Sequence, residues 1–143
     1  MNIFQFIIPK SAVEHLSHDS TVRQAYEKMR YHGYVAIPVI NEQGMYVGTV
    51  SNDDLFGYFL DEGRLDMRSA EKERVLDIIK KDYARPLYHT ATMTELIESV
   101  REHNFVPVVD DRDCFIGIIL RRDVLNFLFK HYENHTQEEK TRD

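Results

Sequence analysis

The chain has 143 residues, of which 43% are hydrophobic and 11% aromatic, enough to bury the core of one globular domain. Its formal net charge of −6 argues against a general binder of nucleic acid or of anionic membranes, because such proteins carry a basic excess, and any anionic ligand would need a local basic cluster. The single cysteine, Cys114, can form neither an internal disulfide nor a cysteine-rich metal site. We expect a cytoplasmic protein.

The first third of the chain predicts a helix followed by a hairpin. Residues 1–9 are apolar but lack a basic region and are too short for a signal peptide or a membrane span, so we expect them to pack. Residues 21–33 begin with a capping box and continue with apolar residues at helical spacing. Residues 34–40 and 45–50 are β-prone and are separated by a polar turn, which predicts two hairpin strands.

A second helix is predicted to start at the capping box of residues 51–54, and the same order of elements then returns. Residues 92–95 repeat the capping box of residues 21–24 after 71 positions. Residues 105–109 and 114–119 repeat the two strands after 69 positions. Such an internal repeat predicts two copies of one unit that cover each other's sheets.

Four segments follow from this pattern. We predict a first repeat with its N-terminal segment at 1–60, a charged linker with a short helix at 61–82, a second repeat at 83–133 and a disordered tail at 134–143.

The duplicated pattern resembles the cystathionine-β-synthase (CBS) domain, and two in tandem resemble a Bateman module. The resemblance rests on Ile37-Pro38-Val39-Ile40, on residues 48–54 and on their counterpart at residues 117–123. It implies an α/β fold of two tandem CBS repeats, each a β-α-β-β-α unit, packed about a pseudo-twofold axis. It also implies ligand clefts where the copies meet, and pairing of two chains into a flat homodimer.

A narrower resemblance is to the stand-alone CBS-pair proteins of Firmicutes that bind cyclic di-AMP. It rests on residues 6–8, Val13 and His15, residues 33–39, a shorter second copy at residues 104–108, and Arg121-Arg122. Where that group tends to carry a lysine in the first segment, this chain has Ala12. The ligand-site residues that the resemblance implies are Lys10, Ala12, Val13, Tyr34, Val35, Ala36, Ile37, Arg121, Arg122 and Asp123.

Arg121 and Arg122 lie where a predicted strand turns into a helix. Guanidinium groups match phosphate oxygens, and the backbone N–H groups of a helix start add donors. The alternative is a solvated pair or an ion pair with acidic residues. Tyr34 can stack on an adenine, or it can be a half-buried aromatic with its hydroxyl in water.

A second ligand cleft is predicted at Ser51, Asp54, Phe105 and Val106. Ser51 and Asp54 fit the ribose-binding pattern of the family. They fit a plain capping box equally well.

No catalytic or metal site is predicted. His131 and His135 are four residues apart on a helix but lack the glutamate of an H-E-x-x-H motif. The paired carboxylates at residues 53–54 and 110–111 occupy cap or turn positions that favour aspartate anyway. We therefore expect no enzyme and no cofactor.

The predicted function is regulatory. An adenine nucleotide, in the first place cyclic di-AMP, would bind and alter a partner protein that the sequence does not name. Sensing of AMP, ADP or ATP in the same cleft, and a ligand-free interaction module, are the alternatives. Apolar positions on the second helix of each repeat exceed what the core needs, which favours a homodimer. Neither nucleic acid nor a membrane is predicted as a partner.

Overall fold

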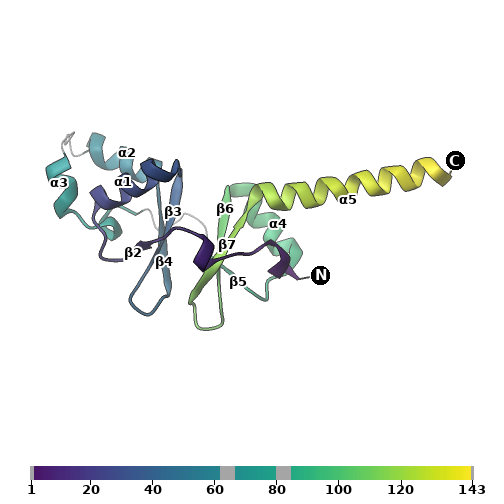
Figure 1. Cartoon of the computed structure of the whole chain (residues 1–143), viewed down its shortest axis with the longest axis horizontal. Coiled ribbons are helices and arrows are strands. Elements are labelled where there is room, and N and C mark those ends of the chain that lie inside the picture. The colour runs from purple at the N-terminus through teal and green to yellow at the C-terminus, as the bar shows by residue number, and fades with distance from the viewer. Residues whose placement is uncertain (1, 62–66, 80–84, 143) are drawn as a thin grey trace.

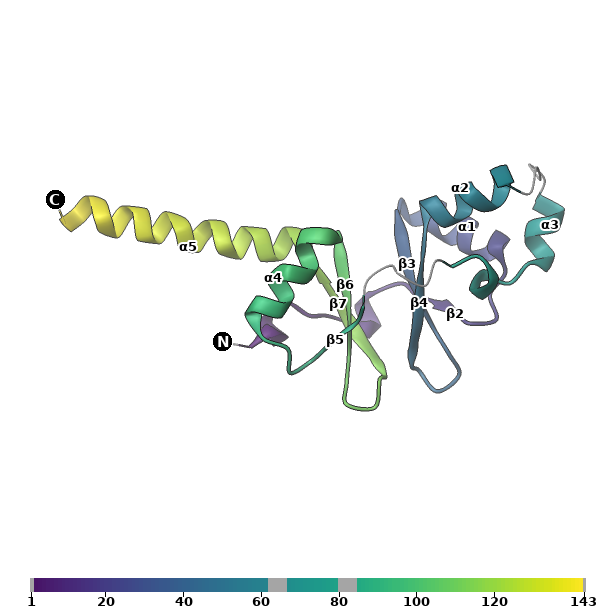
Figure 2. The same ribbon diagram turned by 180° about the vertical axis from the view of Figure 1, so that it is seen from behind.

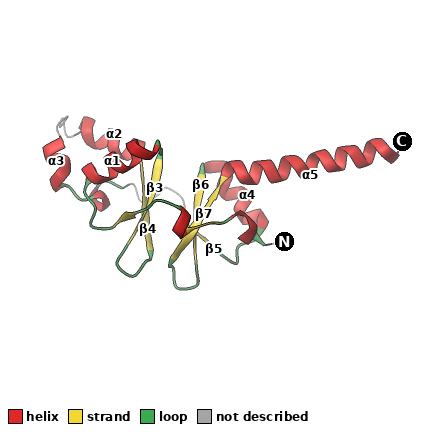
Figure 3. Cartoon of the chain, viewed as in Figure 1, coloured by secondary structure: helices red, strands yellow, loops and turns green. Residues whose placement is uncertain are grey.

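The computed structural model describes residues 2–61, 67–79 and 85–142, and it contains two α/β halves that lie side by side (Figures 1 and 3). In the first half the elements are β2 (Leu16–Ser17), α1 (Val22–His32), β3 (Ala36–Ile40), β4 (Tyr46–Ser51), α2 (Asn52–Asp61), α3 (Met67–Lys72) and the 3-10 helix η3 (Val75–Asp77). In the second half they are β5 (Leu87–Tyr88), α4 (Met93–Glu102), β6 (Phe105–Val109), β7 (Phe115–Leu120) and α5 (Arg121–Arg142). The N-terminal segment adds η1 (Ile3–Phe6), β1 (Ile8–Pro9) and η2 (Lys10–Ala12).

Local sequence explains the helices. Thr21 and Thr92 each accept a hydrogen bond from the backbone N–H of the third helical residue, whose side chain accepts one in return, so these two of the three predicted capping boxes are confirmed. Helix α1 ends at Gly33, whose φ of 71° is the left-handed conformation that glycine adopts without strain.

The two sheets have matching topology. The first has the order β2-β3-β4 and the second β1-β7-β6-β5, each with one parallel pair beside an antiparallel hairpin. Gly48 pairs with Val39 and Gly117 with Val108, and both hairpins have a register shift next to that pair. The predicted tandem repeat of α/β units is therefore confirmed.

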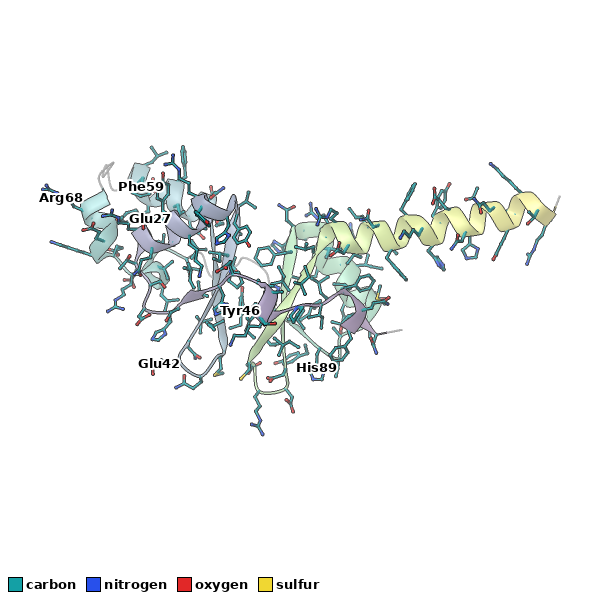
Figure 4. The ribbon with its side chains drawn as sticks, viewed as in Figure 1. Glu27, Glu42, Tyr46, Phe59, Arg68 and His89 are labelled. Carbon is teal, nitrogen blue, oxygen red and sulfur yellow. The ribbon has the colours of Figure 1, made fainter. Side chains whose placement is uncertain are left out.

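The hairpin turns repeat as well. Asn41 Oδ1 accepts from the backbone N–H groups of residues 43 and 45, and Asp110 Oδ1 accepts from those of residues 112 and 114. Backbone hydrogen bonds from Tyr46 to Asp113 and from Phe115 to Gly44 join the two hairpins near their tips. Figure 4 shows Tyr46 where the two halves meet, and its ring stacks on that of Phe115.

The N-terminal segment packs on the second half, although the sequence placed it with the first repeat. Strand β1 pairs with β7, and Ile3 and Phe6 are buried in the core that contains α4 and β6. The sequence pattern predicts that this segment is apolar and packs on the fold. Which of two similar sheets it joins depends on long-range packing.

The described part of the predicted linker, 67–79, belongs to the first core. Ala70 and Val75 are fully buried there. The backbone N–H of Val22 donates to Glu73, and that of Val75 donates to Ser20. The few apolar side chains of this segment are therefore enough to pack it into the first core.

Residues 134–142 continue helix α5 and project away from the body (Figures 1 and 2), where we expected a disordered tail. The segment contains neither glycine nor proline, and residues 137–140 are good helix formers. The Thr136 and Thr141 hydroxyls donate to carbonyl groups one turn earlier. The polar composition of residues 134–142 was therefore not sufficient to predict disorder.

Candidate functional site

A pocket of about 350 Å³ lies between the two halves. Residues 33–36 and Pro38 of the first half line it, together with β6 and β7 of the second half and with residues 8 and 12–14 of the N-terminal segment. Its lining residues are mostly apolar: Ile8, Ala12, Val13, Glu14, Gly33, Tyr34, Val35, Ala36, Pro38, Asn104, Phe105, Ile118 and Leu120. A slot of this size and polarity suits a flat aromatic ring.

A second depression, of about 420 Å³, adjoins the first because both are lined by Asn104 and Leu120. Its remaining lining residues are Arg121, Arg122, Leu125 and Asn126. The apolar pocket therefore adjoins a depression lined by the two arginines at the start of α5.

The two arginines are held differently. Arg121 Nε donates to the Val100 carbonyl at 2.7 Å, which fixes its guanidinium against the end of α4. Arg122 is exposed, and no hydrogen bond or ion pair joins its side chain to another described residue. Two arginines that line one depression, in a chain of net charge −6, form a local basic cluster.

Glu14 and Tyr34 lie at the pocket edge nearest α1. The Lys28 ammonium lies 3.0 Å from Glu14 Oε2. Through that hydrogen bond and its charge, Lys28 holds the pKa of Glu14 below its ordinary value. His32 Nε2 lies 3.8 Å from Glu14 Oε1, and the His32 ring stacks on Tyr34 with centroids 5.1 Å apart.

The structure brings together most of the predicted main site. Ala12, Val13, Tyr34, Val35 and Ala36 line the pocket, and the two arginines line the adjoining depression.

Three predicted residues lie elsewhere. Ile37 is fully buried in the first core, and Asp123 lines neither depression. The Lys10 Nζ lies 3.7 Å from the point where a β-carbon on Gly44 would stand, so this side chain extends toward the hairpin tip. Side chains alternate along a strand, so Ala36 and Ile37 cannot both face the pocket.

Of the four residues of the predicted second cleft, only Phe105 lines either of these two depressions. Ser51 Oγ accepts from the Asp54 N–H at 3.2 Å, and Asp54 Oδ2 accepts from the Ser51 N–H at 2.9 Å. These two residues cap α2, and Asp54 is only 5% exposed. Phe105 lines the main pocket, whereas Val106 is fully buried in the core.

Several lining residues were missed by the sequence analysis, above all Glu14 and Asn104. Asn104 corresponds to Val35 under the 69-residue offset, and this replacement of an apolar by a polar residue was an available signal. Glu14 gave no signal of its own, because its role depends on a contact with Lys28, fourteen positions later.

Within residues 2–61, 67–79 and 85–142, no three His, Cys, Asp or Glu side chains come close enough to hold one metal ion. No helix in the same ranges has the length and hydropathy needed to cross a membrane.

This arrangement defines a tandem α/β pair with an apolar and basic pocket between its halves. The CBS domain family model matches residues 7–61 and 75–130, and the chain belongs to that family. It is 26% identical over 127 residues to the cyclic di-AMP receptor B of Bacillus subtilis (strain 168), covering 89% of this chain and 86% of that protein.

Solved structures share the fold. The crystal structure of CbpB in complex with c-di-AMP superposes with a TM-score of 0.84 at 23% identity, covering 96% of this chain and 91% of that one. The crystal structure of CBSX2 in complex with AMP superposes with a TM-score of 0.73 at 20% identity, covering 92% and 98%. The fold prediction made from the repeat is confirmed.

Proposed function

We propose that this chain is a regulatory adenine-nucleotide-binding protein whose ligand is cyclic di-AMP. The observation that carries the proposal is the apolar pocket that opens beside Arg121 and Arg122. One base enters the apolar pocket, and the arginines hold phosphate oxygens at its mouth. The sequence similarity to the Bacillus receptor and the shared fold of the CbpB complex support the choice of ligand.

The ligand would act by bridging the two repeats. Residues 33–36 belong to the first half, while β6, β7 and the arginines that begin α5 belong to the second half. A ligand shifts only an equilibrium between states that it contacts differently, so bridging favours one arrangement of the repeats. We propose that a cytoplasmic partner protein recognises that arrangement, and that the chain itself catalyses no reaction.

A mononucleotide sensor for AMP, ADP or ATP is the second candidate. The pocket of about 350 Å³ has room for one base, and the CBSX2 complex with AMP shares the fold. Both candidates place a base in the same pocket, and they differ in whether a single nucleotide or a linked pair of nucleotides fills the site.

A thermal-shift panel on the wild type tests the proposal. At a ligand concentration 100 times Kd, cyclic di-AMP is expected to raise the Tm by about 5–10 °C, because a ligand stabilises the state that binds it. AMP, ADP and ATP at the same concentration are expected to give smaller shifts. A larger shift with AMP would favour the mononucleotide sensor, and no shift with any nucleotide would favour the ligand-free interaction module.

We further propose that a second copy of the chain covers α2 and α5. Phe56 and Leu60 are 67% and 56% exposed on α2, and their repeat counterparts, Leu125 and Phe129, are 53% and 61% exposed on α5. In each helix the two residues lie four positions apart and so share one face. Because the two helices present matching apolar faces, a twofold-related copy can cover both at once.

Phe129→Glu is expected to turn the dimer into a monomer, since it would bury a charge in that interface. Light scattering after size exclusion should give twice the chain mass of 16.9 kDa for the wild type and a single chain mass for the variant. Tyr31→Glu is the control, because Tyr31 is 85% exposed on α1, outside the two helices of the interface. A wild type that is monomeric at all concentrations would refute the dimer.

A further inference from the structure

The pocket wall contains an unusual charge. Of the described residues that line it, only Glu14 has an ionisable carboxyl or a cationic group, and the rest are apolar apart from Tyr34 and Asn104. The faces of a nucleobase suit such apolar walls, but its edge carries polar groups that need partners when buried. Glu14 is therefore the strongest available partner for the edge of a base.

The Glu14 side chain is held from α1. Lys28 and His32 lie one helical turn apart on α1. The Lys28 ammonium lies 3.0 Å from Glu14 Oε2, and His32 Nε2 lies 3.8 Å from Glu14 Oε1. Lys28 Nζ also donates to the His15 carbonyl at 2.8 Å, so its ammonium is fixed at two points. Lys28 is thus a positioning residue for Glu14.

The ionised carboxylate accepts hydrogen bonds and donates none. It has about four lone-pair sites, of which Lys28 uses one, and the 3.8 Å separation from His32 is too long for a hydrogen bond. Acceptor capacity therefore remains for a group that enters the pocket.

We propose that Glu14 determines base specificity, by accepting a hydrogen bond from the exocyclic amine of an adenine. This inference rests on the proposed function. In the orientation that points position 6 at Glu14, a 6-oxopurine places its O6 against the carboxylate, where two acceptors repel each other. A pocket that holds the base in this orientation would therefore select 6-aminopurines over 6-oxopurines.

Calorimetric titration with cyclic di-AMP and cyclic di-IMP, in which an oxo group replaces each amine, tests this role. The wild type is expected to prefer cyclic di-AMP by about tenfold or more, as for other hydrogen bonds to a charged group. Glu14→Gln is expected to lose the preference, because its amide can offer either oxygen or nitrogen.

Glu27→Gln is the matched control. It also removes one negative charge, but on α1, where Glu27 (labelled in Figure 4) pairs with Arg23 at 2.9 Å. Because Glu27 does not line the pocket, the preference for cyclic di-AMP should persist. Lys28→Met, which releases the carboxylate, is expected to reduce the preference, and it decides the question if Glu14→Gln does not fold.

Three outcomes would overturn the inference. One is an unchanged preference for cyclic di-AMP in folded Glu14→Gln, and another is equal binding of both ligands by the wild type. Either outcome would leave the proposed function intact. A wild type that binds no adenine nucleotide would remove the proposed function and the inference together.

Discussion

The variant Arg121→Ala/Arg122→Ala is expected to bind cyclic di-AMP at least about 100-fold more weakly than the wild type. Each guanidinium is proposed to make a charge-assisted hydrogen bond to phosphate, and such bonds contribute roughly 1.5–3 kcal/mol each. Calorimetric titration measures the loss directly, and the thermal shift with ligand should fall with it.

The single variants separate binding from stability. Arg121 also donates to the Val100 carbonyl, so Arg121→Ala is expected to cost about 1 kcal/mol of unfolding free energy besides affinity. Arg122 has no such bond to a described residue, so Arg122→Ala should weaken binding alone. Arg112→Ala, an exposed arginine in the β6–β7 turn, is the matched control. Wild-type affinity in both Arg121→Ala and Arg122→Ala would show that these residues hold no phosphate.

Gly117→Ala is expected to destabilise the fold strongly. A β-carbon at Gly117 would stand 2.1 Å from the Ile8 carbonyl oxygen, so β1 would have to leave β7. Such overpacking costs roughly 2–4 kcal/mol, which corresponds to a fall in Tm of about 5–15 °C. Because Ile8 also lines the base pocket, affinity for the nucleotide should fall as well.

Gly48→Ala provides an internal control, because Gly48 is the repeat counterpart of Gly117. Among the described residues, its added β-carbon would meet only the side chain of Ile79, at 3.4 Å, which is ordinary contact. The expected loss of stability is below about 1 kcal/mol by chemical denaturation. Equal losses in the two variants would mean that β1 does not depend on the close approach at Gly117.

Elements that depend on neighbouring residues were predictable. The capping boxes at Thr21, Thr92 and Ser51 each involve side chains three positions apart, so the sequence contains the whole interaction. The left-handed end of α1 at Gly33 is local in the same sense. The constant offset between the repeats then predicted the second hairpin from the first, since two similar stretches adopt similar hairpins.

The candidate site was predictable only to the level of segments. The stretches around residues 12, 34 and 121 do meet, but strand alternation sends Ile37 and Val106 into the core while Ala36 and Phe105 face the pocket. Which face of each strand meets the ligand depends on the side from which the helices cover the sheet, and short apolar runs do not reveal this.

The sequence by itself determined the duplicated α/β unit, its capped helices and the two arginines at the start of α5, because periodicity and local hydrogen bonding specify them. The tertiary structure alone decided that β1 joins the second sheet, that residues 67–79 complete the first core, and that Lys28 turns Glu14 into a fixed carboxylate of the pocket. These features depend on contacts between distant residues, and several sequence positions satisfy the same local pattern equally well.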